Sequence, residues 1–224
     1  MIETSEARRV RAAREQVATA CAVLVASGHG GAPSGGIVVR DPDHDDVLAT
    51  PAGVAFEEVR AEDLVRVPSA GGDRDRVPWN GAAVAAAFLR ARADLTALVH
   101  THALHATAFS ITGRALRALS HEGCHLVPPA PSCLRRAGVA ELTAALERQR
   151  ACLLRGHGLV AVGEQLGEAV ALAVYLERSC QLDLLAGAEA YGASDGAVRD
   201  KRAGQRKRPA MSWRYLARTQ GRRG

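Results

Sequence analysis

Apolar and polar positions alternate along this chain with two periods, one helical and one extended. Apolar residues at helical spacing predict an opening amphipathic helix over 6–27. The same spacing predicts further helices, which cover 81–91, 103–111, 140–149 and 167–185. Short apolar runs predict strands at 36–40, 47–50, 62–67, 94–102, 124–128 and 151–162. Because helices and strands alternate and a hairpin comes early, we expect one α/β domain.

Turn-forming and capping residues place the ends of several elements. The glycine-rich segment 28–36 is expected to end the first helix, and Asn80 is placed to cap the second. The tripeptide Gly-His-Gly at 156–158 interrupts the last predicted strand with a kink.

The composition narrows the classes of protein to which this chain can belong. Hydrophobic residues make up 47% of the 224 positions and aromatic residues only 4%, so Ala, Val and Leu must form a large core. No apolar run is long enough for a membrane span, and the polar N-terminus does not resemble a signal peptide. The five cysteines are odd in number and lack Cys-x-x-Cys spacing. We therefore expect a reduced, cytoplasmic protein with no membrane partner.

Positive charge is concentrated at the C-terminal end. The formal net charge is +5, yet residues 199–224 hold ten Lys and Arg against one Asp, which leaves the rest of the chain at −4. Such a tail can bind polyanions, but a solvated, partly disordered extension is the simpler interpretation. Trp213 and Tyr215 suit a docking element better than a stacking platform. We expect a domain at 1–198, a basic tail at 199–224 and no nucleic-acid partner.

Two histidines stand at the end of a predicted buried strand, Leu-Val-His-Thr-His at 98–102. Side chains two positions apart on a strand point to the same face, so the imidazoles of His100 and His102 can bind one metal ion. His157 follows much later, in the kink of the last strand. Three histidines are the ligand count of an open, catalytic metal site.

The segment 99–108 resembles the metal motif of the class II aldolase/adducin family. Three further segments agree with that family in order and spacing. They are Thr-Pro-Ala-Gly at 50–53, Arg-Ala-Arg-Ala-Asp at 90–94, and Gly-His-Gly-Leu at 156–159 followed by Ala169, Val170 and Glu177. The resemblance covers roughly residues 6–186.

This resemblance implies a three-layer α/β/α sandwich around a central, mainly antiparallel sheet. It also implies a homotetramer with active sites between neighbouring subunits. His100, His102 and His157 would be the metal ligands, with zinc expected first and Fe(II) or manganese as alternatives. The implied chemistry is that of a Lewis acid, in which a divalent metal binds adjacent oxygens of a small-molecule substrate. Glu177 is expected to be a buried, helix-anchoring group and His105 to pack against the site.

The chain departs from the family pattern at the catalytic carboxylate. Family aldolases carry a glutamate one helix upstream of the paired histidines, and counting back from His100 without gaps places Gly81 there. Segment 77–83 contains no carboxylate, so the usual base is missing. His121 stands where several family aldolases have a proton-donating tyrosine, often presented to the neighbouring subunit. We predict that His121 or Glu122 moves the proton, because imidazole titrates near neutrality and Glu122 could replace the carboxylate.

The family's phosphate-binding residues are also replaced. Its Gly-Asn before the first strand is Gly35-Gly36 here, and the Thr of its Thr-Gly pair is Ala52. The paired serines before the glutamate fall at Trp79 and Asn80. A phosphate needs several converging hydrogen-bond donors, whereas Trp79 favours an apolar or aromatic group. We therefore infer a substrate other than a sugar phosphate.

Some hydrogen-bond donors remain in this region. Ser34 and the backbone amides of Gly35 and Gly36 can still bind substrate oxygens. Together with Trp79 and Asn80, they are the predicted substrate-binding residues.

Three functions are open. The first is a metal-dependent lyase that performs aldol or retro-aldol carbon–carbon chemistry on a small, non-phosphorylated carbonyl substrate, in specialised metabolism. The second is a non-haem Fe(II) oxygenase on the same scaffold, because three imidazoles with open positions also suit Fe(II) and O₂. The third is a non-catalytic binding module like adducin, against which an intact histidine triad argues.

Overall fold

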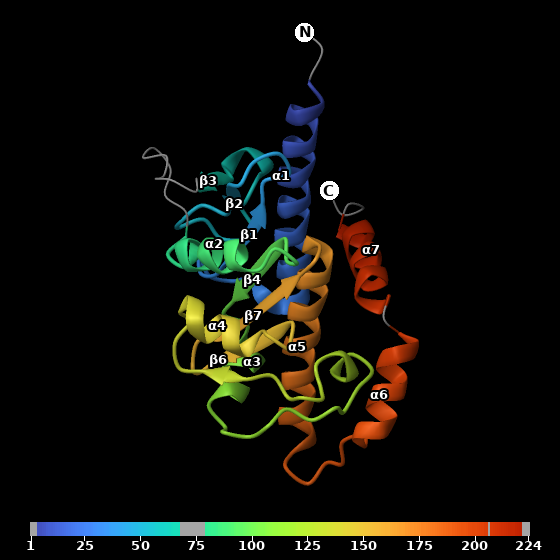
Figure 1. Ribbon diagram of the computed structural model, residues 1–224. Coiled ribbons are helices and arrows are strands. Elements are labelled where there is room, and N and C mark those ends of the chain that lie inside the picture. Colours follow the sequence, from blue (N-terminus) through green and yellow to red (C-terminus); the bar gives the residue numbers. More distant parts are fainter. Residues whose placement is uncertain (1–3, 68–78, 206, 221–224) are drawn as a thin grey trace.

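A sheet forms the middle layer of the protein (Figure 1). The computed structural model describes residues 4–67, 79–205 and 207–220. Within these residues the strand order is β3-β2-β1-β4-β7-β6-β5, and every neighbouring pair is antiparallel except β5 and β6. The strands are β1 (Gly36–Arg40), β2 (Val47–Ala49), β3 (Val65–Val67), β4 (Ala97–Thr101), β5 (Cys133–Leu134), β6 (Ala151–Leu154) and β7 (Gly158–Gly163).

Helices cover both faces of this sheet. One face is covered by α1 (Ser5–Leu24), α3 (Leu104–Ser110) and α5 (Leu166–Ala186). The other face is covered by α2 (Ala82–Ala91) and α4 (Val139–Ala145). The predicted three-layer α/β/α sandwich is thereby confirmed, with the two helical layers visible on opposite sides of the strands in Figure 1.

Short helical turns and two C-terminal helices complete the described chain. A π-helical turn, η1 (Val25–His29), extends α1, and the 3₁₀ turns are η2 (Ala61–Asp63) and η3 (Gly123–His125). The C-terminal helices are α6 (Asp195–Gly204) and α7 (Arg208–Gln220). No helix of the described chain is both long enough and apolar enough to cross a bilayer. All five cysteines are free thiols.

Successive side chains of β4 point to opposite faces of the sheet and therefore contact different helical layers. Ala97 and Val99 pack in the core cluster of the α1/α5 layer, whereas Leu98 packs in the cluster of the α2/α4 layer. Because side chains alternate between faces, His100 shares the face of Leu98. The imidazole of His100 therefore lies on the α2/α4 side of the sheet.

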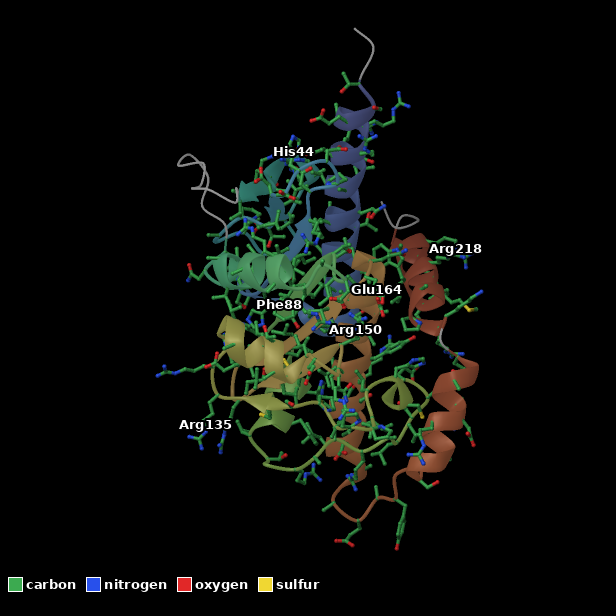
Figure 2. All side chains as sticks on the ribbon, in the orientation of Figure 1. His44, Phe88, Arg135, Arg150, Glu164 and Arg218 are labelled. Carbon is green, nitrogen blue, oxygen red and sulfur yellow. The ribbon has the colours of Figure 1, made fainter. Side chains whose placement is uncertain are left out.

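The strand predicted over 151–162 is instead a hairpin of β6 and β7. Gly156 and Gly158 adopt φ values of 65° and 134°, which side chains with a Cβ rarely allow, so the chain reverses at the expected kink. Arg150 and Glu164, which lie side by side in Figure 2, pair at 3.0 Å across the open end of the hairpin.

Two other local predictions were wrong. Residues 124–128 contain part of η3 and no strand, and the prolines that follow lack the N–H that a sheet ladder requires. Asn80 does not cap α2, because the N-cap is Gly81 and makes no side-chain bond there. The backbone carbonyl of Trp79 accepts the Ala82 N–H instead, at 2.9 Å.

The basic C-terminal segment is helical over its described part. In α7, Trp213 packs against the α5 backbone at Gly167, where a Cβ would collide with the indole. The Tyr175 hydroxyl of α5 and the Ser212 hydroxyl of α7 lie 2.6 Å apart. The docking role expected of Trp213 is therefore confirmed, and α7 lies alongside α5 in place of a solvated extension (Figure 1).

Two buried polar side chains fix the region where β4 ends and α3 begins. The Glu177 carboxylate accepts the backbone N–H of His105 at 3.0 Å and that of Ala106 at 2.7 Å. His105 Nδ1 also lies 2.7 Å from this carboxylate. A carboxylate at a helix N-terminus satisfies otherwise unpaired donors and matches the helix dipole. The expected anchoring role of Glu177 is confirmed.

His29, to which the sequence assigned no role, is the second of these side chains. It is 5% exposed, and its Nδ1 is hydrogen-bonded with the Thr101 hydroxyl at 2.9 Å. Its Nε2 is buried without a partner among the described residues. Burial lowers the pKa of His29 from 6.5 to about 4. The imidazole is therefore neutral in the folded protein near pH 7.

The buried imidazole of His29 predicts a pH-dependent stability. Between pH 6.5 and 4 the unfolded chain binds a proton at this residue that the folded chain does not, so the free energy of unfolding falls as the pH decreases. In His29→Gln, we expect the loss between pH 7 and pH 4.5 to be smaller by about 2–3 kcal/mol. Denaturant unfolding of both metal-free proteins at the two pH values measures this difference. Equal losses would contradict a neutral His29.

Candidate metal centre

His100 is held in one tautomer by the neighbouring strand. It lies near the end of β4, is 5% exposed, and its Nδ1 is 2.9 Å from the carbonyl oxygen of Leu159 on β7. Because a carbonyl can only accept, Nδ1 must carry the proton. The lone pair is then on Nε2, as a metal ligand with a backbone partner requires.

His102 and His157 both lie close to Nε2 of His100. His102 follows β4 on the same face, and its Nε2 lies 3.1 Å from His100 Nε2. His157 lies in the turn between β6 and β7. This turn approaches β4 closely because Gly158 has no Cβ, which would collide with the Thr101 carbonyl oxygen. The approach brings the His157 ring within 4.4 Å of the His102 ring, measured between centroids.

The three imidazoles fit a single metal ion. Each offers one ligand nitrogen, and these atoms lie within 4.8 Å of one another. Tetrahedral ligands at the usual zinc–nitrogen distance are separated by about 3.3 Å, which the observed spacing accommodates. No carboxylate belongs to this cluster among the described residues. The predicted triad of His100, His102 and His157 is thus assembled in the structure.

The environment keeps His100 and His102 neutral. The pKa of His100 is lowered to about 4, mainly by burial and also by repulsion from the other two imidazoles, while the hydrogen bond to the Leu159 carbonyl opposes this shift. The pKa of His102 is also lowered, first by burial and then by His157. Unprotonated imidazoles are the form that binds a metal ion, so the site is prepared for one near neutral pH.

Trp79 forms a wall beside the triad. Its indole stacks on the His100 ring with centroids 5.5 Å apart and planes 27° from parallel. A Cβ at Gly36 or at Gly81 would collide with this indole. Glycine at both positions, on β1 and at the start of α2, therefore creates the space that Trp79 occupies.

A cavity of about 370 Å³ opens on the triad. This volume falls within the range of roughly 300–1,000 Å³ typical of small-molecule sites. Four of the five predicted substrate-binding residues line it, namely Ser34, Gly35, Trp79 and Asn80. Gly36 does not line it and lies behind the indole instead. The role of all five in binding substrate stays a prediction.

His121 and Glu122 do not line this cavity. They directly precede η3, which packs against α5 and α6 on the opposite helical layer. There, the Glu122 charge acts on Tyr175 and contributes to raising the pKa of that phenol, after burial as the main cause. Within one chain the structure does not bring these two residues to the triad, and their catalytic role stays a prediction.

The apolar part of the cavity was missed in the sequence. Its lining includes Val84, Leu142, Leu154 and Val160. A signal was available for one of them, because Val160 is paired with His100 across β4 and β7 and so shares its face. The residues from α2 and α4 gave no such signal, since their contribution depends on how the helices pack over the sheet.

Comparisons with known proteins agree with this architecture. A model of the class II aldolase and adducin N-terminal domain matches residues 15–184. L-fuculose phosphate aldolase of Escherichia coli K12 is 30% identical over 178 residues, which cover 75% of this chain and 81% of that protein. The solved structure of L-fuculose 1-phosphate aldolase from Glaciozyma antarctica PI12 superimposes with a TM-score of 0.83 at 25% identity, over 99% of this chain and 94% of that one.

A relative named for a different activity has a similar sequence identity to this chain. It is the 4-hydroxy-3-prenylphenylpyruvate oxygenase/4-hydroxy-3-prenylbenzoate synthase of Streptomyces roseochromogenus subsp. oscitans, 32% identical over 168 residues. The match covers 69% of this chain but only 60% of that longer protein. Fold, triad and family model agree, and the chain belongs to the class II aldolase and adducin family.

Proposed function

We propose that this protein is a metal-dependent lyase that forms or breaks a carbon–carbon bond in a small carbonyl compound by aldol or retro-aldol chemistry. The observation that carries the proposal is the triad, in which three imidazole nitrogens converge at a cavity of small-molecule size. The fuculose-phosphate aldolase relatives support a lyase. The divalent ion is zinc in our proposal, with manganese or Fe(II) as the alternatives.

The chain's own residues position the reactants. A divalent ion bound at the triad supplies Lewis-acid polarisation of a substrate carbonyl. The Leu159 carbonyl and the Trp79 indole fix the His100 ring, so the ligand nitrogen does not reorient during turnover. At the exposed rim, Ser34 and Asn80 offer a hydroxyl and an amide to the substrate's oxygens.

The group that moves the proton is, in our proposal, supplied by a neighbouring subunit. None of the described residues lining the cavity is an Asp or Glu. We propose a homotetramer in which the exposed His121, or Glu122 beside it, reaches the triad of a neighbouring subunit. An imidazole suits this step because it gains and loses a proton near neutral pH.

An Fe(II)-dependent oxygenase is the second candidate. It is supported by the similarity to the prenylphenylpyruvate oxygenase and by the imidazole ligands, which suit iron as well as zinc. A non-catalytic binding module, the third possibility, has no need of a metal site, and the assembled triad argues against it.

Replacing His102 with alanine tests the metal site directly. Loss of a residue that only orients a metal ligand typically weakens metal affinity by about 10- to 100-fold. Loss of one of the three protein ligands should therefore weaken it by at least about 100-fold. Metal content of untagged protein after dialysis, measured by elemental analysis, checks this expectation. His44→Ala is the matched control, because His44 lies in the loop between β1 and β2 and does not line the cavity (Figure 2). Equal metal content in His102→Ala and wild type would refute the proposed site.

The identity of the metal separates the two enzyme candidates. We expect untagged protein to retain zinc or manganese and to consume no O₂ with carbonyl or 2-oxo acid substrates. Elemental analysis and an oxygen electrode on the same sample measure both properties. Iron as the retained metal, together with substrate-dependent O₂ uptake, would establish the oxygenase instead.

A further inference from the structure

The exposed and the buried residues that line the cavity differ in polarity. Its exposed members near the triad are small or polar and include Gly53, Ala52 and Asn80. Its fully buried members, apart from His100, are all apolar. They are Ala85, Leu98, Leu142, Leu154 and Val160, each no more than 2% exposed. We call these five residues and the partly buried Trp79, Val84 and Ala137 the apolar chamber.

The apolar chamber lies between the sheet and one helical layer. Leu98, Leu154 and Val160 come from β4, β6 and β7 on the face that carries His100. Val84 and Leu142 come from α2 and α4, which cover that face. The buried residues of the chamber therefore belong to one hydrophobic core cluster, and the three histidines line the same cavity.

Charged groups are absent from this lining. Among the described residues that line the cavity, none is Lys, Arg, Asp or Glu. A phosphate in the apolar chamber would lose its hydration without gaining a charged partner, which is costly. An uncharged apolar group would instead gain free energy in proportion to the surface it buries.

We propose that the substrate carries an uncharged apolar group, about the size of an aryl ring, which fills the apolar chamber while the substrate's oxygens lie at the triad. This inference rests on the proposed metal-dependent function and specifies its substrate class. Trp79 becomes a specificity-determining residue, because its indole stacks on the ligand His100 and also lines the chamber.

Three hydroxamates that share one pair of chelating oxygens test the inference. They are acetohydroxamate, benzohydroxamate and phosphonoacetohydroxamate, and they differ only in the group beside the chelating pair. Titration calorimetry on the metal-loaded protein, with its metal content measured, gives the three dissociation constants. We expect benzohydroxamate to bind at least about tenfold more tightly than either of the others, equivalent to about 1.4 kcal/mol.

A charge placed in the chamber should reverse this preference. Val84→Arg puts a guanidinium among the lining residues and is expected to weaken benzohydroxamate about tenfold or more and to strengthen phosphonoacetohydroxamate. Ala83→Arg is the matched control, because Ala83 is exposed on the same helix and does not line the cavity. The control should retain the wild-type order of affinities, which also shows that an added arginine on α2 leaves the fold intact.

The outcomes distinguish the inference from the function on which it rests. If all three hydroxamates bind only when metal is present, but with equal affinity or with the phosphonate tightest, the apolar substrate class is wrong and the metal site stands. If none binds in a metal-dependent manner, the proposed function itself fails. A Val84→Arg protein that keeps the wild-type order while folded would also overturn the inference.

Discussion

The close approach of the β6–β7 turn to the end of β4 is the constraint on which the site depends. His100 and His102 lie on one strand, whereas His157 is 55 positions further along the chain. Pairing of β4 with β7 brings the two segments side by side, and Gly158 lets the turn contact the Thr101 carbonyl. A side chain at Gly158 would push the turn away and separate His157 from its partners. Backbone packing therefore brings the three imidazoles together.

Contacts on the opposite face of the sheet also fix the end of β4. Thr101 lies between the two histidines of β4 but points to the α1/α5 layer, where its hydroxyl meets the buried His29. Directly after β4, Glu177 of α5 holds the first turn of α3 through two backbone N–H groups. Both contacts are buried and polar, so each loses more when broken than a surface pair would. These contacts hold the end of β4 from the α1/α5 side of the sheet, whereas the imidazole of His100 lies on the α2/α4 side.

Local pattern was sufficient for most of the elements of the sandwich and for two of the three ligands. The alternation at 98–102 places His100 and His102 on one face whatever the rest of the fold. His157 was a candidate from its place in the Gly-His-Gly kink, and the family motif supported it, but its distance from the other two depends on a hairpin that the apolar run at 151–162 concealed. The apolar chamber could not be foreseen at all, since Val84 and Leu142 reach it only through the packing of two helices over the sheet. His29 was missed because a histidine beside glycines has the pattern of a loop.

Charge balance connects the triad to the chamber. Three neutral imidazoles leave the full charge of a divalent ion uncompensated, whereas a glutamate ligand would remove one unit. None of the described residues that line the cavity is an Asp or Glu that could replace it. Negative charge on the substrate's own oxygens, at the end of the molecule that meets the triad, would compensate the ion. In a sugar phosphate the charge lies at the far end of the molecule, and the family's phosphate-binding positions are here occupied by residues such as Gly36, Ala52 and Trp79. The missing carboxylate and the apolar chamber thus favour the same substrate, one that is anionic where it reacts and uncharged where it is held.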